Sequence, residues 1–149
     1  MSKPRILVLC TGNSARSQMA EGLVRHYHGD RFEVASAGVA PSPVRPEAIE
    51  VMGELGIDIS AQRSKHVDEL AGQRFDYVLT VCDPARESCP VFPGAVSFHH
   101  DIRDPAGGAG PEPARLAEFR RARDELRSYL NAWVPTLADL SGDPGPGRV

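Results

Sequence analysis

Short apolar runs alternate along this chain with longer segments in which apolar residues recur every three or four positions. Runs rich in β-forming residues at 5–9, 32–37, 76–81 and 95–98 each predict a strand. The run at 76–81 carries apolar residues on both faces, which is typical of a central strand. Helical spacing predicts helices after residue 14, from about 46 to 55 and over 113–133, with a short one at 66–71.

Polar residues and prolines mark where these helices begin and end. Ser14 or Asn13 is expected to cap the first helix, and Pro46 to begin the second. Gly56 is expected to end the second helix. The Gly- and Pro-rich tail at 141–149 is predicted to be disordered.

Strands that alternate with helices predict an α/β fold: a three-layer sandwich with a four-stranded parallel sheet and helices on both faces. We expect a single catalytic domain over residues 1–140. Ligands of such sheets bind at the carboxyl ends of the strands. The end of the first strand is therefore the first place to look for a site.

Composition and charge exclude several classes of protein. The chain has 149 residues, 41% of them hydrophobic, and a net charge of −3 that argues against nucleic-acid binding. No apolar stretch approaches the roughly 20 residues of a membrane span, and no secretion signal is evident, so we expect a cytoplasmic protein without membrane contact. We also expect a monomer. Three cysteines are too few, and odd in number, for a structural disulfide framework.

The residues after the first strand have the composition of an anion-binding loop with a nucleophile. Cys10 is followed by five residues and then by Arg16 and Ser17. Small residues let backbone N–H groups point inward, and the next helix adds its positive amino end. The arginine can grip an oxyanion through two parallel hydrogen bonds, and the same field favours a thiolate at the cysteine. The expected substrate-binding residues are Thr11, Gly12, Asn13, Ser14, Ala15, Arg16 and Ser17.

This loop resembles that of the low-molecular-weight tyrosine phosphatase family and, within it, the thioredoxin-coupled arsenate reductases. The segments that carry the resemblance are 10–21, 36–38, 81–83, 89–90, 104–106 and 119–125. It implies the same three-layer α/β fold, with arsenate as substrate and thioredoxin as reductant. It implies neither a cofactor nor a catalytic metal.

The resemblance also implies a role for each cysteine. Cys10 attacks arsenate, Cys82 attacks Cys10 and releases arsenite, and Cys89 attacks Cys82 to form a disulfide that thioredoxin reduces. Asp104, which precedes a proline, matches the family's general acid, which protonates the departing oxygen. By itself, an aspartate before a proline more often begins a turn.

The chain departs from the family pattern at two positions. Some arsenate reductases hold a potassium ion behind the loop, and Asn13, Glu21 and Ser36 match three of its ligands. The fourth position is Lys65. Our hypothesis is that its ammonium group replaces the ion and pairs with Glu21; the alternative is a solvent-exposed charge without such a role. Ala15 stands where the tyrosine phosphatases usually have a second cysteine, which favours the reductase.

Two other functions remain open. A phosphomonoesterase would use the same loop, because phosphate and arsenate are nearly isosteric, but it would not need Cys82 and Cys89. A redox-sensing or oxyanion-binding protein would use Cys10 without turnover. Metal binding by His99 and His100 is disfavoured, since neighbouring residues of a strand point to opposite faces.

Overall fold

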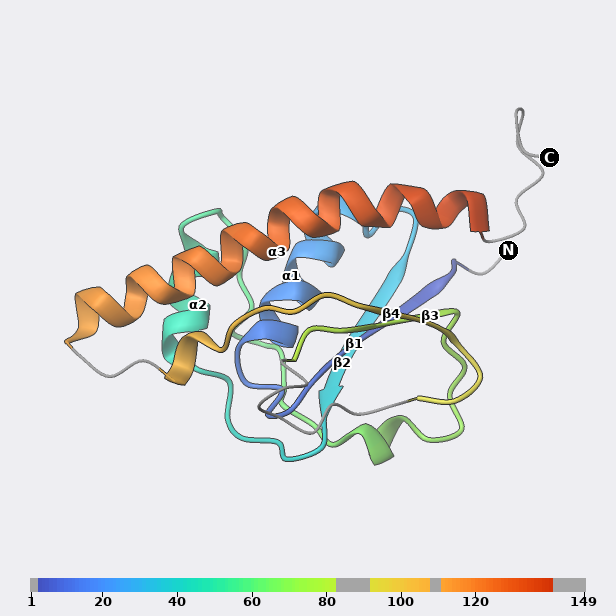
Figure 1. The fold of residues 1–149 in the computed structure, drawn as a ribbon, viewed down its shortest axis with the longest axis horizontal. Helices are drawn as coiled ribbons and strands as arrows, with labels where there is room; N and C mark the ends of the chain where they lie inside the picture. The colour runs from blue at the N-terminus through green and yellow to red at the C-terminus, as the bar shows by residue number, and fades with distance from the viewer. Residues whose placement is uncertain (1–2, 83–91, 108–110, 141–149) are drawn as a thin grey trace.

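The computed structural model describes residues 3–82, 92–107 and 111–140 (Figure 1). Within these ranges the predicted alternation of strands and helices is confirmed. In chain order the elements are β1 (Arg5–Cys10), α1 (Arg16–His28), β2 (Glu33–Gly38), α2 (Pro46–Gly53), the 3₁₀ helix η1 (Val67–Leu70), β3 (Tyr77–Thr80), β4 (Val96–His99), the 3₁₀ helix η2 (Pro105–Gly107) and α3 (Glu112–Leu140).

The four strands form one sheet in the order β2-β1-β3-β4, and every pairing is parallel. The predicted four-stranded parallel sheet is therefore confirmed. The chain leaves β1 toward β2 and then returns to place β3 on the other side of β1. Connections that diverge in this way leave a crevice at the carboxyl ends of the two central strands. Cys10 is the last residue of one of them.

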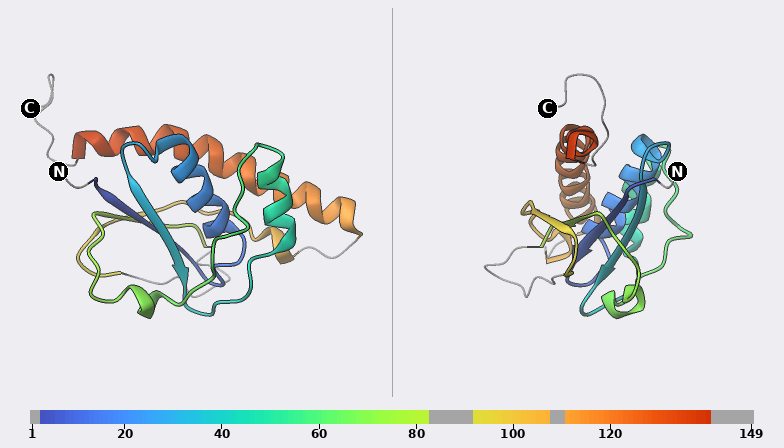
Figure 2. Two further views of the ribbon diagram at one scale, coloured as in Figure 1. Left: turned by 180° about the vertical axis from the view of Figure 1, so that it is seen from behind. Right: turned by 90° about the vertical axis from the view of Figure 1, so that its right-hand side faces the viewer.

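Helices pack on both faces of the sheet, as predicted, but unequally (Figure 2). Alternate residues of β1 face opposite sides. Ile6 and Val8 pack in the core under the three α-helices, whereas Leu7 and Leu9 pack in a smaller core that includes Leu70 of η1. In the described part of the chain, the α-helices thus all cover one face and a 3₁₀ helix lies on the other.

The last helix is longer than the sequence pattern predicted. It continues to Leu140, past the expected end at residue 133 and through Pro135 (Figure 1). A proline inside a helix removes one backbone hydrogen bond and disfavours the helical conformation before it. Here Val134 and Leu137 are fully buried against the sheet, and the Tyr77 hydroxyl donates to the Leu137 carbonyl at 3.2 Å. The burial of these side chains outweighs the tendency of Pro135 to end the helix.

Gly56 ends the second helix as predicted. Its φ is +77°, a conformation that glycine adopts without strain. The Ile57 N–H donates to the Met52 carbonyl at 3.1 Å, and the Gly56 N–H donates to the Gly53 carbonyl at 2.9 Å. These two bonds form a Schellman motif, which closes a helix through a left-handed residue.

Among the described residues, no helix is long and apolar enough to cross a membrane. The predicted disordered tail at 141–149 lies outside the described residues, as does the segment 83–91.

Candidate active site

The loop after β1 joins the sheet directly to α1. Cys10 is 2% exposed, and Arg16 is the first residue of the helix. The expected cap by Ser14 or Asn13 is wrong: the N-cap is Ala15, and no side chain caps the helix. The Asn13 side chain bonds elsewhere, as described below. A helix amino end without a side-chain cap suits an anion, which can take the place of the capping oxygen.

The loop is held in place by the segment that follows β2. The N–H groups of Val39 and Ala40 donate to the Thr11 carbonyl at 3.0 and 2.9 Å. The Ser42 N–H donates to the Gly12 carbonyl at 3.0 Å, and the Arg45 N–H to the Ser14 carbonyl at 2.8 Å. These four bonds fix the outer side of the loop to residues about 30 positions further along the chain.

The sulfur of Cys10 has two hydrogen-bond partners from the loop and helix. The Asn13 N–H donates to Sγ at 3.2 Å, and Ser17 Oγ lies 2.8 Å from Sγ. Ser17 Oγ also accepts from Asn13 Nδ2 at 2.7 Å. The sulfur of Cys10 therefore lies within hydrogen-bond distance of both the Asn13 N–H and the Ser17 hydroxyl group.

Asn13 is the central polar residue of the loop, fully buried and with a φ of +47°. Its Nδ2 donates to Ser17 and to Ser36 Oγ, the latter at 2.9 Å. Its Oδ1 accepts from Gln18 Nε2 at 3.1 Å and from the Lys65 N–H at 3.0 Å. Asparagine tolerates the left-handed conformation, and its amide group here has a partner for each polar atom.

The polar network continues behind the loop to a buried carboxylate. Ser36 Oγ donates to Glu21 Oε1 at 2.6 Å, and Arg25 Nη2 donates to Glu21 Oε2 at 2.6 Å. Lys65 and Glu21, both described, do not form the expected direct ion pair: Lys65 Nζ donates to the Arg63 carbonyl at 3.1 Å, and Arg25 is the direct cationic partner of Glu21. Burial lowers the pKa of Lys65 below its ordinary value, and the charge of Glu21 acts in the opposite direction, so the two side chains still interact electrostatically.

Arg16 and Asp104 meet on the other side of the loop. Arg16 is 4% exposed, its Nη1 donates to the Ile102 carbonyl at 3.1 Å, and its Nη2 lies 3.9 Å from Asp104 Oδ2. The Asp104 side chain is about half exposed, and its Oδ1 accepts the Ala106 N–H at 2.9 Å. One oxygen of Asp104 therefore holds the turn into η2, while the other faces Arg16.

These groups surround a cavity of about 280 Å³ at the carboxyl end of β1. Among the described residues that line it, none is aromatic. The cavity has room for a tetrahedral oxyanion and offers it a cysteine, an arginine and a carboxyl group. It is lined by Cys10, Thr11, Gly12, Ser14, Ala15, Arg16, Ser42, Arg45, Asp104 and Ala106.

The predicted site residues are distributed as follows. Five of the seven binding-loop positions line the cavity, and the other two, Asn13 and Ser17, bond to the sulfur of Cys10. Cys82 is fully buried directly after β3, beside the end of β1, since the Val81 N–H donates to the Leu9 carbonyl at 3.0 Å. Cys89 lies outside the described residues.

The sequence pattern missed Ser42 and Arg45 in the cavity wall. Both lie in a Pro-rich connection that has no periodicity, and only the backbone bonds to the loop bring them to the site.

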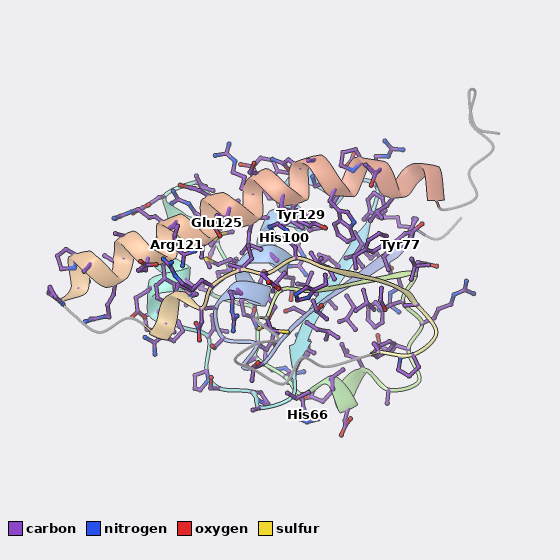
Figure 3. The ribbon with its side chains drawn as sticks, viewed as in Figure 1. His66, Tyr77, His100, Arg121, Glu125 and Tyr129 are labelled. Atoms are coloured by element: carbon purple, nitrogen blue, oxygen red, sulfur yellow. The ribbon has the colours of Figure 1, made fainter. Side chains whose placement is uncertain are left out.

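The two neighbouring histidines lie apart, as the strand geometry predicted. His99 Nδ1 is 2.6 Å from Thr80 Oγ1, and its Nε2 bonds to Asp101. His100 instead stacks on Tyr129 of α3, with ring centroids 4.0 Å apart (Figure 3). The two rings therefore do not share a ligand.

A cysteine held by a loop before a helix, beside a buried arginine at the carboxyl ends of a parallel sheet, is typical of an enzyme that acts on small tetrahedral oxyanions. The family follows from comparison with known proteins. The chain belongs to the low molecular weight phosphotyrosine protein phosphatase family, whose model matches residues 5–141.

Several relatives of the chain have named activities. An arsenate reductase of Halalkalibacterium halodurans is 42% identical over 137 residues, which are 91% of this chain and 99% of that protein. A solved thioredoxin-dependent arsenate reductase of Corynebacterium glutamicum superposes with a TM-score of 0.65 at 26% identity, over 90% of this chain and 63% of the other. A solved arginine phosphatase of Geobacillus stearothermophilus gives a TM-score of 0.71 at 29% identity, over 90% and 92%.

Proposed function

We propose that this protein is a thioredoxin-dependent arsenate reductase that uses Cys10, Cys82 and Cys89 in sequence. The observation that carries the proposal is the sulfur of Cys10, which has two hydrogen-bond partners at the base of an oxyanion-sized cavity. The 42% identity to an arsenate reductase over nearly the whole of that protein supports arsenate as the substrate.

In the first step, the Cys10 thiolate attacks the arsenic atom of arsenate. A sulfur–arsenic bond forms and an arsenic–oxygen bond breaks, and Asp104 gives the departing oxygen a proton so that it leaves as water. The 3.9 Å separation of Asp104 from Arg16 supports this role, because Arg16 is placed to bind the remaining oxygens. The loop N–H groups and the helix amino end bind the same oxygens.

In the second step, Cys82 attacks the sulfur of Cys10. A sulfur–sulfur bond forms, the sulfur–arsenic bond breaks, and its electron pair stays on arsenic, which leaves as arsenite. Cys89 then attacks Cys82, which frees Cys10, and thioredoxin reduces the resulting disulfide of Cys82 and Cys89. The position of Cys82 next to the end of β1 supports the first of these exchanges.

A phosphomonoesterase is the second candidate, and a specific observation favours it. The cavity is built for a tetrahedral oxyanion, and a relative of similar TM-score is an arginine phosphatase. The absence of an aromatic side chain among the described lining residues argues against a phosphotyrosine ring as substrate. Weak hydrolysis of small phosphomonoesters is compatible with the reductase proposal.

The remaining proposals concern the compartment in which the protein works and its oligomeric state. A relay that ends on thioredoxin requires a reducing compartment, so we propose that the protein works in the cytoplasm. We propose that it works as a monomer, since Cys10, Arg16 and Asp104 all come from one chain.

The function is tested by offering arsenate and p-nitrophenyl phosphate to the same preparation of the enzyme. With thioredoxin, thioredoxin reductase and NADPH present, we expect arsenite to form at a kcat/KM at least about 100-fold above that for p-nitrophenyl phosphate hydrolysis. Cys10→Ser should abolish both reactions. Efficient phosphate ester hydrolysis without arsenite formation would establish the phosphatase instead.

A further inference from the structure

A second guanidinium lies in the wall of the active-site cavity. The loop after β1 supplies Arg16, and Arg45 comes from the residue that precedes α2. The Arg45 side chain is 38% exposed, whereas that of Arg16 is 5% exposed. Arg16 thus lies at the buried base of the cavity and Arg45 at its solvent side.

The backbone holds Arg45 rigidly beside the loop. Its N–H donates to the Ser14 carbonyl at 2.8 Å, and its φ and ψ of −69° and 133° are those of an extended residue. Pro46 follows as the first residue of α2, and proline restricts the residue before it to this region. A side chain on so constrained a backbone loses little entropy when it binds a ligand.

Glu47 orients the guanidinium group of Arg45 but does not bond to all of its N–H groups. Arg45 Nη2 donates to Glu47 Oε2 at 3.0 Å, and Arg115 Nε lies 3.5 Å from the same oxygen. Within the described part of the chain, the buried Nε of Arg45 has no hydrogen-bond partner. Burial raises the pKa of Glu47, but a backbone hydrogen bond and the two arginines lower it below its ordinary value. Arg45 therefore shares the carboxylate of Glu47 with Arg115.

The charges inside the cavity show why a second cation is needed. A thiolate at Cys10 already offsets the charge of Arg16, and Asp104 carries the proton that it gives up in the first step. A dianion that enters must come close to the thiolate. With Arg16 alone, the dianion and the thiolate would share one positive charge, an arrangement that Coulomb repulsion opposes.

We propose that Arg45 is a second oxyanion-binding residue, which recruits doubly charged tetrahedral anions to the mouth of the cavity before they reach the loop. Arg45 would bind the oxygens that face solvent, and Arg16 with the loop N–H groups those that face Cys10. The ligand class is a small tetrahedral dianion such as arsenate or phosphate. The proposal deepens the proposed function but does not require that arsenate be reduced.

The test is calorimetric titration of inorganic phosphate into reduced protein at pH 8, where phosphate is mostly a dianion. We expect the dissociation constant to rise about tenfold in Arg45→Gln, equivalent to about 1.4 kcal/mol. Arg45→Lys should keep most of the affinity, because a cation remains. Phosphate binding does not depend on electron transfer, so failure of the reductase proposal would leave this result unaffected.

The matched control is Arg115→Gln. Arg115 also pairs with Glu47 but does not line the cavity, so its loss should change phosphate affinity less than twofold. Thermal unfolding of each variant checks that the fold is intact. Wild-type affinity in Arg45→Gln, or equal weakening in Arg115→Gln, would overturn the proposal.

Discussion

At the scale of single residues, Ser17 links the side chain of Asn13 to the sulfur of Cys10. Its oxygen accepts from Asn13 Nδ2 at 2.7 Å and lies 2.8 Å from that sulfur. The geometry depends on Asn13, whose φ of +47° brings its own N–H to the same sulfur. Two residues four positions apart thus prepare Cys10 before any substrate arrives.

We therefore predict that Ser17→Ala slows alkylation of Cys10. Loss of a hydrogen bond to a charged group amounts to about 1.5–3 kcal/mol, so iodoacetamide should react about tenfold more slowly at pH 7. Mass spectrometry of the peptide that contains Cys10 measures the rate. Ser97→Ala, on an exposed position of β4, is the control and should react like the wild type. Equal rates for Ser17→Ala and wild type would show that the hydroxyl does not stabilise the thiolate.

At the scale of elements, the end of β2 lies closely against the loop. A Cβ at Gly38 would be 2.4 Å from the Thr11 carbonyl oxygen and 2.8 Å from that of Cys10. Both are backbone atoms of the loop, which cannot move without displacing Cys10. The glycine therefore sets the distance between strand and loop.

Gly38→Ala should both destabilise the protein and weaken phosphate binding. We expect a loss of about 2 kcal/mol, the usual size of an overpacking effect, measured as a lower urea midpoint. Gly53→Ala is the matched control, since nothing lies within 4 Å of its Cβ position and it belongs to α2. That variant should be as stable as the wild type or slightly more so. A fully active Gly38→Ala protein would contradict this account of the loop.

The contact between α2 and α3 includes a shared carboxylate. Glu54 Oε2 accepts from Arg120 Nη2 at 2.7 Å, and Glu54 Oε1 accepts from Arg123 Nη1 at 2.7 Å. These hydrogen bonds lower the pKa of Glu54 from 4.5 to about 2. The carboxylate therefore stabilises the fold above its ordinary pKa, and this contribution disappears as the pH falls from about 4.5 through 2.

Glu54→Gln tests this pH dependence. The group is about one third exposed, so we expect a loss of only about 1 kcal/mol at pH 7. The difference from wild type, measured by urea unfolding, should shrink between pH 4.5 and pH 2.5. Glu50→Gln, at an exposed position of α2, should lower the stability less than Glu54→Gln at both pH values. A difference that grows on acidification would contradict the assignment.

The sequence predicted the elements in which tertiary packing agrees with the conformation that the local residues prefer. Periodicity and the loop composition were sufficient for the strands and for Cys10 and Arg16. They were not sufficient for the end of α3, where buried Val134 and Leu137 outweigh Pro135. Nor were they sufficient for the cap of α1, where the Asn13 side chain bonds to other side chains and does not cap the first N–H groups of the helix. Arg45 and the pairing of Arg25 with Glu21 depend on contacts between distant segments, which no local pattern encodes.

At the scale of the whole molecule, the sheet order brings the chemistry together. Because β3 lies beside β1, the segments that carry Cys10 and Cys82 end at the same edge, although they are more than 70 positions apart in sequence. The connection from β4 brings Asp104 to the same cavity. Cys10, Asp104 and Cys82 thus converge at the carboxyl ends of the strands.

The most direct test of the account is the number of arsenite molecules released per enzyme. With thioredoxin, thioredoxin reductase and NADPH, wild type should complete many turnovers and oxidise one NADPH for each arsenite formed. Cys89→Ser should stop after about one arsenite per enzyme, because the disulfide of Cys10 and Cys82 cannot be passed on to thioredoxin. Sustained turnover by Cys89→Ser, or no arsenate-dependent NADPH oxidation by wild type, would contradict the three-cysteine relay.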